Sequence, residues 1–354
     1  MTLEFSPHYR RIATEEAWAS PRMLDVYRRE LEGGHIDDPG FHSLWGYYLG
    51  STERASTLIE RIVDTDDGRL AAMDAAGVDQ MVLATTAPGV QALRPEVAVP
   101  LAREINDELA DAVAAHPDRY DGLTAIAPQD PDAAADEIRR GHDALGFRGV
   151  ILNSHARGEY LDDLRFDPIF AAAEELDTPI YLHPTTPIPR LAEPFIEAGL
   201  DGAIYGFSVE AGLHLLRLIT SGVFDRHPKL KLVVGHLGEA LPFWMWRLDF
   251  MHATSVRSQR YDAIKPLELP ISGYLKRNIW ITTSGMPWHP AVNFVREAVG
   301  LDRLMFAWDY PYQWRPDEVE TFEALDWSVD DKRRFFQMTA EDVFGLTPRA
   351  PRGA

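Results

Sequence analysis

The sequence predicts an α/β protein, a (β/α)₈ TIM barrel of parallel strands covered by helices. Eight short apolar runs alternate along the chain with segments whose apolar residues recur at helical spacing. The runs are apolar almost throughout, which is typical of parallel strands buried on both faces. Several of them end on a carboxylate or a histidine. Because the carboxyl ends of barrel strands converge at one mouth, we expect these end residues to meet there.

The expected strands and helices alternate along the chain. In order, the strands are Ile12–Glu15, Gln80–Ala84, Gly122–Ala127, Gly149–Asn153, Ile180–His183, Leu232–His236, Ile279–Ser284 and Leu304–Asp309. The clearest helical patterns are Asp67–Ala76, Ala102–Ala115, Asp132–Leu145, Phe170–Leu176, Gly212–Thr220 and Leu241–Met251. Eight such units favour a closed barrel over an open doubly wound sheet. No glycine-rich nucleotide-binding motif follows any expected strand.

We expect a single barrel domain over residues 1–354. Residues 20–64 form an insertion after the first strand that is rich in aromatic and charged side chains, and we expect this segment to cap the barrel mouth. Residues 348–354 resemble a frayed tail.

Composition excludes several classes of function. The formal charge of −20 repels nucleic-acid phosphates and acidic membranes, and no run of lysine or arginine offsets it. Neither a leader-like start nor an apolar run of membrane length is present, so we expect a cytoplasmic protein with no nucleic-acid or membrane partner. The sequence has no cysteine, which excludes disulfides, thiolate ligands and a cysteine nucleophile. Any metal must therefore be held by His, Asp or Glu.

Three strand-end residues form a candidate metal site. Glu15, His183 and Asp309 close the first, fifth and eighth expected strands, and they supply two oxygens and one nitrogen with coordination positions left open. An oxygen-rich set suits one Mn²⁺, with Zn²⁺ as the alternative. A lone strand-end histidine is more often structural than a ligand, but His183 and His236 share the expected barrel phase with Glu15 and Asp309. The neighbouring Glu16 points to the other face of the strand, so we expect a structural role for it.

Several strings resemble the metal-dependent decarboxylase branch of the amidohydrolase superfamily, with its aminocarboxymuconate-semialdehyde and dihydroxybenzoate decarboxylases. They are RIATEEAW (11–18), APGVQ (87–91), YLHP (181–184), GHLGE (235–239) and DYPY (309–312). The 5-carboxyvanillate decarboxylases resemble the chain most fully, through SLWGYY (43–48), ERA (53–55) and VRSQRY (256–261). The resemblance implies an amidohydrolase-type barrel and the same three ligands on a single Mn²⁺. Ala17 replaces a histidine found in many superfamily members, and Asn153 replaces a bridging lysine, so a two-metal hydrolase site is disfavoured.

The expected reaction is non-oxidative decarboxylation of an ortho-hydroxy aromatic acid, such as 5-carboxyvanillate or a dihydroxybenzoate. The metal chelates the phenolate and one carboxylate oxygen, and the ring carbon is protonated before CO₂ leaves. The resemblance implies Asp309 as the proton donor. A metal-bound carboxylate has a lowered pKa, so we expect the proton to arrive with the substrate. His236 and Glu239 are expected to form a supporting pair in the proton network.

The substrate's negative charge requires local cations. Arg54 on the cap and Arg247 on the helix after strand six match the arginines that the resemblance places at substrate carboxylates, and Tyr312 lies just beyond the last strand. Ordinary surface ion pairs are the alternative for both arginines. The family often completes its pocket across a subunit contact, which implies a homodimer or homotetramer in which Arg247 and Tyr312 act on the neighbouring site.

Two other functions remain open at this point. One is a mononuclear metal-dependent amide or lactone hydrolase on the same barrel, with Asp309 as the base. The other is a metal-free barrel that only binds a ligand, which the four residues Glu15, His183, His236 and Asp309 disfavour.

Overall fold

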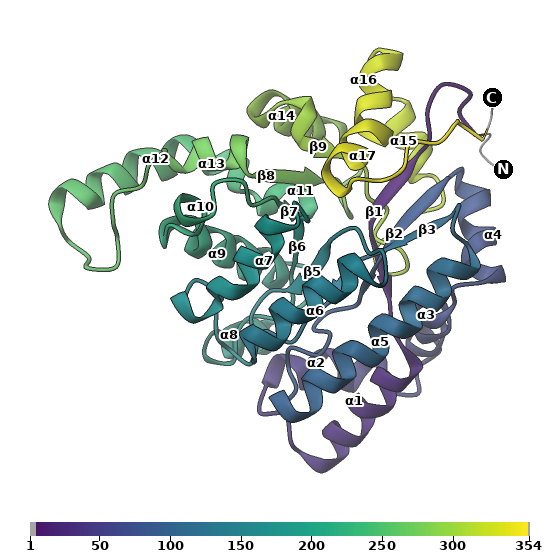
Figure 1. Ribbon diagram of the computed structural model, residues 1–354, viewed down its shortest axis with the longest axis horizontal. Coiled ribbons are helices and arrows are strands. Elements are labelled where there is room, and N and C mark those ends of the chain that lie inside the picture. The colour runs from purple at the N-terminus through teal and green to yellow at the C-terminus, as the bar shows by residue number, and fades with distance from the viewer. Residues whose placement is uncertain (1–4, 353–354) are drawn as a thin grey trace.

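The computed structural model describes residues 5–352 and has nine strands within them, all parallel (Figure 1). One sheet has the order β1-β2-β3 and the other the order β4-β5-β6-β7-β8-β9. The strands are β1 (Ile12–Trp18), β2 (Gln80–Thr85), β3 (Tyr120–Gly122), β4 (Thr124–Ala125), β5 (Val150–Asn153), β6 (Ile180–His183), β7 (Leu232–Val234), β8 (Ile279–Thr282) and β9 (Leu304–Met305). Nearly every strand residue is buried, as expected for strands with helices outside and side chains filling the barrel.

Individual hydrogen bonds connect the two sheets at the two places where regular strand pairing stops. Leu123 separates β3 from β4, and its amide still bonds to Leu83 of β2. On the opposite side, the Ala17 amide of β1 donates to the Tyr310 carbonyl at 2.8 Å. The Glu16 carboxylate accepts the amides of Trp308 and Tyr310 at 2.8 and 3.0 Å, so a side chain replaces part of the missing ladder. The structure thus agrees with the predicted barrel and gives Glu16 a structural place in it.

Helices fill the connections between strands. They are α4 (Asp67–Ala76), α5 (Pro95–Ala115), α6 (Pro131–Asp143), α7 (Asp167–Glu175), α8 (Pro189–Ala198), α9 (Gly206–Thr220), α10 (Val223–Arg226), α11 (His236–Glu239), α12 (Leu241–Ser258), α13 (Ile271–Arg277), α14 (His289–Val299), α15 (Glu318–Glu323), α16 (Val329–Arg333) and α17 (Thr339–Phe344). Shorter turns are η1 (Leu164–Phe166), η2 (Leu301–Arg303) and the π-turn η3 (Arg334–Met338). Many of the helices begin with proline at the first turn, where a missing N–H is harmless. Within residues 5–352 no helix combines the length and the apolar character needed to span a bilayer.

The predicted insertion forms three helices, α1 (Pro21–Gly33), α2 (Pro39–Tyr48) and α3 (Glu53–Val63). Each helix is preceded by an N-cap residue whose side chain accepts a hydrogen bond from a free backbone amide of the first turn. These residues are Ser20, Asp38 and Thr52, respectively. The buried Arg69 fastens the segment to the barrel, because its Nη2 donates to the Ala17 carbonyl of β1 and to the Arg61 carbonyl of α3. Its guanidinium also lies over the Tyr310 ring.

Observed boundaries differ from the predicted ones mainly at the carboxyl ends of the strands. The last strand stops at Met305, since the chain then leaves the ladder for a left-handed backbone at Asp309 (φ 59°). His236 belongs to a short helical turn instead of strand six. The helices extend beyond most of the predicted segments, and α12 continues to Ser258 as an arm that projects from the body in Figure 1. The predicted tail has no helix or strand up to residue 352, and its last two residues lie outside the described part of the chain.

Candidate metal and substrate site

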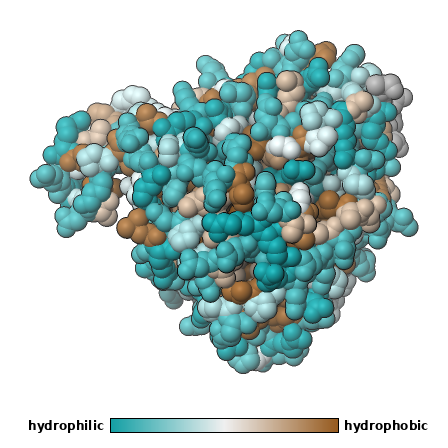
Figure 2. Space-filling model, in the orientation of Figure 1, coloured by the Kyte–Doolittle hydropathy of each residue, from teal (hydrophilic) through white to brown (hydrophobic). Residues whose placement is uncertain are grey.

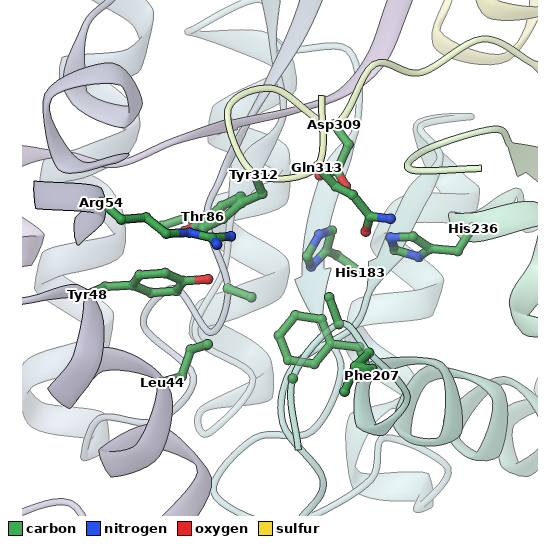
Figure 3. Close-up of a pocket in the computed structure, with 14 residues that line it drawn as sticks. Leu44, Tyr48, Arg54, Thr86, His183, Phe207, His236, Asp309, Tyr312 and Gln313 are labelled. Carbon is green, nitrogen blue, oxygen red and sulfur yellow. The ribbon is translucent and has the colours of Figure 1, made fainter. Parts of the chain in front are cut away.

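A cavity of about 350 Å³ opens at the carboxyl ends of the strands (Figure 3). Charged, polar and apolar side chains all contribute to its walls. The lining residues are Leu44, Tyr48, Arg54, Thr86, Ala87, His183, Gly202, Ala203, Ile204, Phe207, His236, Asp309, Tyr312 and Gln313. Its volume suits one substituted aromatic ring. The cavity lies at the end of the barrel where such folds carry their active sites.

Glu15 lies buried beside this cavity with one oxygen unsatisfied. A register shift in β1 between Ala13 and Glu16 re-aims the side chain into the barrel. Its Oε2 accepts the Tyr181 hydroxyl and, at 3.0 Å, the Thr282 hydroxyl. Its Oε1 is buried and has no hydrogen-bond partner among residues 5–352. A buried, unpaired carboxylate oxygen is expensive, which indicates that a ligand belongs there.

His183 presents a neutral ring nitrogen to that same oxygen. Its Nδ1 donates to the Pro184 carbonyl at 2.7 Å, so the lone pair is on Nε2. Burial lowers the pKa of His183 and keeps the ring uncharged. Its Nε2 lies 3.4 Å from Glu15 Oε1. This orientation, with the far nitrogen fixed by a carbonyl, is the one that metal-binding histidines commonly adopt.

Asp309 lies at the edge of the same cavity on a constrained backbone. Its φ of 59° is unusual for a residue with a side chain, and the Glu16 carboxylate holds the amides on either side of it. Burial and the negative charge of Glu15 raise the pKa of Asp309 to about 8. Two carboxyl groups so placed repel one another unless a cation or a proton lies near them.

His236 and Glu239 form a pair on the turn after β7. His236 Nδ1 and Glu239 Oε1 are 2.8 Å apart, and His236 Nε2 lies 3.8 Å from Glu15 Oε1. Burial alone would lower the pKa of His236, but Glu239 and Glu15 outweigh it and raise the pKa to about 10. The turn approaches Glu15 closely, because a Cβ on Gly235 would lie only 2.5 Å from Glu15 Oε2. Glycine at this position therefore lets the turn reach the site.

The donors at the site fit a divalent cation. In residues 5–352 no three His, Asp or Glu side chains are already grouped at ligand spacing, so the fit rests on the Glu15–His183 pair and on donor chemistry. Two ligand atoms about 2.1 Å from a tetrahedral ion lie roughly 3.4 Å apart, which is the separation of Glu15 Oε1 and His183 Nε2. The unpaired Glu15 oxygen, the neutral imidazole and the nearby Asp309 carboxyl form an oxygen-rich set that suits Mn²⁺ or Zn²⁺.

The predicted substrate residues divide into two groups. Arg54 and Tyr312 line the cavity, and the Tyr312 hydroxyl lies 2.7 Å from the Thr86 hydroxyl. Arg247 does not line it, because it is exposed on the projecting arm of α12. Tyr312 therefore lines the cavity of its own chain, contrary to the expectation that it acts on the neighbouring site, whereas the same expectation for Arg247 stays a prediction.

Sequence reasoning missed several residues that the fold brings to the site. Tyr181 and Thr282, which bind Glu15, lie on β6 and β8. Tyr181 is two residues before His183, so strand alternation placed both on one face and was a usable signal. Phe207 reaches the cavity at the start of α9 and Gln313 from the loop after β9, where periodicity gives no guidance.

The family model for amidohydrolases matches residues 38–346. The chain belongs to the amidohydrolase family.

Two similar solved structures are decarboxylases of aromatic acids. A 5-carboxyvanillate decarboxylase from Novosphingobium aromaticivorans, solved with manganese and 4-hydroxy-3-methoxy-5-nitrobenzoic acid, is 51% identical, with a TM-score of 0.95 over 98% of this amidohydrolase and 99% of that chain. A 2,6-dihydroxybenzoate decarboxylase from Rhizobium is 32% identical, with a TM-score of 0.81 over 95% and 99% of the two chains. The gamma-resorcylate decarboxylase of Rhodococcus jostii is 34% identical over 95% of this chain and 98% of its own length.

Proposed function

We propose that this amidohydrolase is a metal-dependent, non-oxidative decarboxylase of ortho-hydroxy aromatic carboxylic acids of the 5-carboxyvanillate type. The observation that carries the proposal is the unpaired Glu15 oxygen 3.4 Å from the neutral His183 nitrogen, beside a cavity sized for one ring. Likeness to decarboxylases over nearly the whole chain supports the reaction class. A small aromatic acid is the substrate in this proposal, and a 2,6-dihydroxybenzoate decarboxylase among the similar structures is solved with 2,6-dihydroxybenzoate bound.

We assign Glu15, His183 and Asp309 as the residues that hold one divalent ion, with Mn²⁺ favoured because a relative contains it. When bound, the ion supplies positive charge that favours the ionised phenol of the substrate and orients its carboxylate. The Tyr181 and Thr282 hydroxyls hold Glu15 in place through its other oxygen.

Asp309 transfers the proton in this proposal. It takes the phenol proton as the substrate binds and delivers it to the ring carbon that carries the carboxylate. The carbon–carboxylate bond then breaks, its electron pair restores the aromatic ring, and CO₂ leaves. The product phenolate takes a proton from solvent. Burial and the negative charge of Glu15 raise the pKa of Asp309 to about 8, which makes its carboxylate a stronger base towards the phenol proton.

His236 and Glu239 support this step. Glu239 keeps the buried imidazole protonated and oriented by the 2.8 Å contact, so His236 holds a positive charge beside the reacting carboxylate. Arg54 and Tyr312 line the other side of the cavity and bind the substrate's remaining polar groups.

A homodimer or homotetramer completes the proposal. The α12 arm carries apolar side chains that face solvent in the single chain, among them Phe243 (74% exposed) and Trp246 (77% exposed). Figure 2 shows brown, hydrophobic side chains on this arm among hydrophilic ones. We infer that the arm packs against a second copy and carries Arg247 to the partner's cavity. The cytoplasmic location remains a prediction from the sequence.

The test of the reaction is a panel of ortho-hydroxybenzoates that includes 5-carboxyvanillate, incubated with Mn²⁺-loaded protein in deuterated buffer. We expect CO₂ release and a product with deuterium at the carbon that lost the carboxylate. Turnover of 5-carboxyvanillate alone would fix the substrate, whereas turnover of another acid would keep the reaction and correct the pocket assignment. Absence of CO₂ from every acid, with metal bound, would refute the proposal and favour hydrolysis of an amide or lactone.

A further inference from the structure

A second hollow lies at the opposite end of the barrel, where the strands begin. Its volume is about 480 Å³. Arg10 precedes β1, His116 to Arg119 form the turn before β3, and Arg349 and Arg352 lie on the C-terminal segment. The two ends of the described chain meet here, since the Arg352 guanidinium lies over the Phe5 ring at 4.2 Å. The lining residues are Arg10, Ala115, His116, Pro117, Asp118, Arg119, Arg349, Ala350 and Arg352.

Arg10 is a buried cation with unused donors. Its Nη2 donates to the Asp118 carbonyl at 3.1 Å. The residue is only 2% exposed, yet Nε and Nη1 have no hydrogen-bond partner in the part of the chain that the structure describes. Buried guanidinium groups without acceptors are costly and therefore uncommon. The hollow that Arg10 lines is the place from which an acceptor would reach these two donors.

The carboxylates that pair with the other three arginines of the hollow form no ion pair with Arg10 among the described residues. Arg119 and Arg352 share the single carboxylate of Asp74, at 2.9 and 3.0 Å. Arg349 Nη1 lies 2.8 Å from Asp118 Oδ1, but this nitrogen is buried and has no aligned hydrogen bond within residues 5–352. Four arginines around one hollow contrast with the net charge of −20 for the whole chain.

More distant carboxylates act on Arg10 through charge and make no hydrogen bond to its guanidinium within the described residues. Burial lowers the pKa of the Arg10 guanidinium, while Asp79, Asp121 and Glu341 act in the opposite direction and Arg349 adds repulsion. Burial also raises the pKa of Asp79 and Asp121, and the nearby arginines oppose that rise. An oxyanion in the hollow would satisfy Arg10 directly.

We propose that this hollow binds a small oxyanion, either a phosphate or a carboxylate. Guanidinium groups match both, because their paired N–H donors bind two oxygens of one anion. The site is separate from the active site, since Arg10 lies before β1 and Glu15 lies within it, about 17 Å apart along an extended chain. A bound anion would join the segment before β1 to the C-terminal segment that carries Arg349 and Arg352.

The test is calorimetric titration of the Mn²⁺-loaded full chain with inorganic phosphate and with succinate. The nitro acid bound by the relative, 4-hydroxy-3-methoxy-5-nitrobenzoic acid, is present in excess to fill the active-site cavity. We expect one anion per chain. The double variant Arg349→Gln/Arg352→Gln removes two half-buried guanidiniums and should weaken binding about tenfold or more.

A matched control removes the same charge elsewhere. Arg139→Gln/Arg165→Gln changes two exposed arginines on another part of the surface and should leave anion affinity unchanged. Arg10→Met tests the buried cation directly and should abolish binding if the variant folds. Binding of either anion that depends on Arg349 and Arg352 supports the site and names its ligand class. No saturable binding, or equal loss in the control, would overturn it.

Discussion

The middle of β1 and the segment just before it present opposite chemistry. Within β1, Glu15 keeps an unpaired, buried oxygen beside His183 and Asp309, and the neighbouring cavity fits a cation. Just before β1, Arg10 keeps two unpaired, buried nitrogens in the hollow that Arg349 and Arg352 also line, and this hollow fits an anion. In both places the chain leaves a buried charge unsatisfied next to a space large enough for a ligand. The sign of each unpaired buried charge therefore indicates the sign of the ligand that the neighbouring space binds.

The largest effect is expected from Glu15→Gln. A neutral amide removes the negative charge of Glu15, so we expect loss of bound Mn²⁺. The rate of decarboxylation should fall about 10⁴-fold, because metal stabilisation of the transition state is worth several kcal/mol. Metal content by atomic absorption and CO₂ release measure the two effects. Glu60→Gln on the exposed side of α3 is the control and should behave as the unaltered protein. Full metal content in Glu15→Gln would break the comparison.

A smaller effect is expected from Asp309→Asn, which separates metal binding from proton transfer. The amide oxygen still binds a cation, but the side chain no longer carries an acidic proton, so we expect retained Mn²⁺ and turnover reduced about 10³-fold. The readouts are metal content and deuterium incorporation into the product. Normal turnover with metal bound would remove Asp309 as the acid.

Mixing two inactive variants tests the subunit contact. Arg247→Ala lacks the proposed partner arginine, and Glu15→Gln lacks the metal site. In a mixed dimer the first chain keeps an intact cavity and receives Arg247 from the second. Random exchange then restores about a quarter of the sites. Activity measured after co-refolding checks this, and no recovery despite proven exchange would place Arg247 outside the partner's site.

Glu318 is a buried carboxyl group that lines neither hollow, and Glu318→Gln tests what such a group costs the fold when no ligand site lies beside it. Both oxygens of Glu318 lack partners, and burial together with Asp309 and Glu16 raises its pKa to about 9 from 4.5. Because the folded state binds this proton more tightly, the carboxyl group destabilises the fold increasingly as pH rises from 4.5 to 9. We expect the variant to be more stable by roughly 3 kcal/mol at pH 7 and little changed at pH 4.5. Urea unfolding at both pH values measures it, and equal gains would contradict the pKa.

The sequence predicted the barrel because its apolar runs and helical periods are regular from Ile12 to Leu304. It also placed Glu15 and His183, since each lies on a strand whose side chains alternate in a known way. The positions of His236 and Asp309 were less predictable. Both have positive φ in turns after the ladder ends, and contacts with Glu239 and Glu16 hold them there.

Charges at the amino ends of the strands were not foreseen. Arg10 and Arg349 are far apart in sequence, and no periodic pattern joins them. Only the folded chain brings them to one hollow. Arg247 illustrates the converse, because its residue type matched the expected chemistry while the fold of one chain leaves it on an exposed arm.

The unsatisfied Glu15 carboxylate of β1, together with His183 and Asp309, is proposed to hold one catalytic divalent cation. The most direct measurement strips the protein of metal and titrates Mn²⁺ back while recording CO₂ release from 5-carboxyvanillate. We predict no turnover at the start and a linear rise that saturates at one Mn²⁺ per chain. Full turnover by the stripped protein, or Mn²⁺ binding that brings no CO₂ release from any ortho-hydroxy aromatic acid, would contradict the claim.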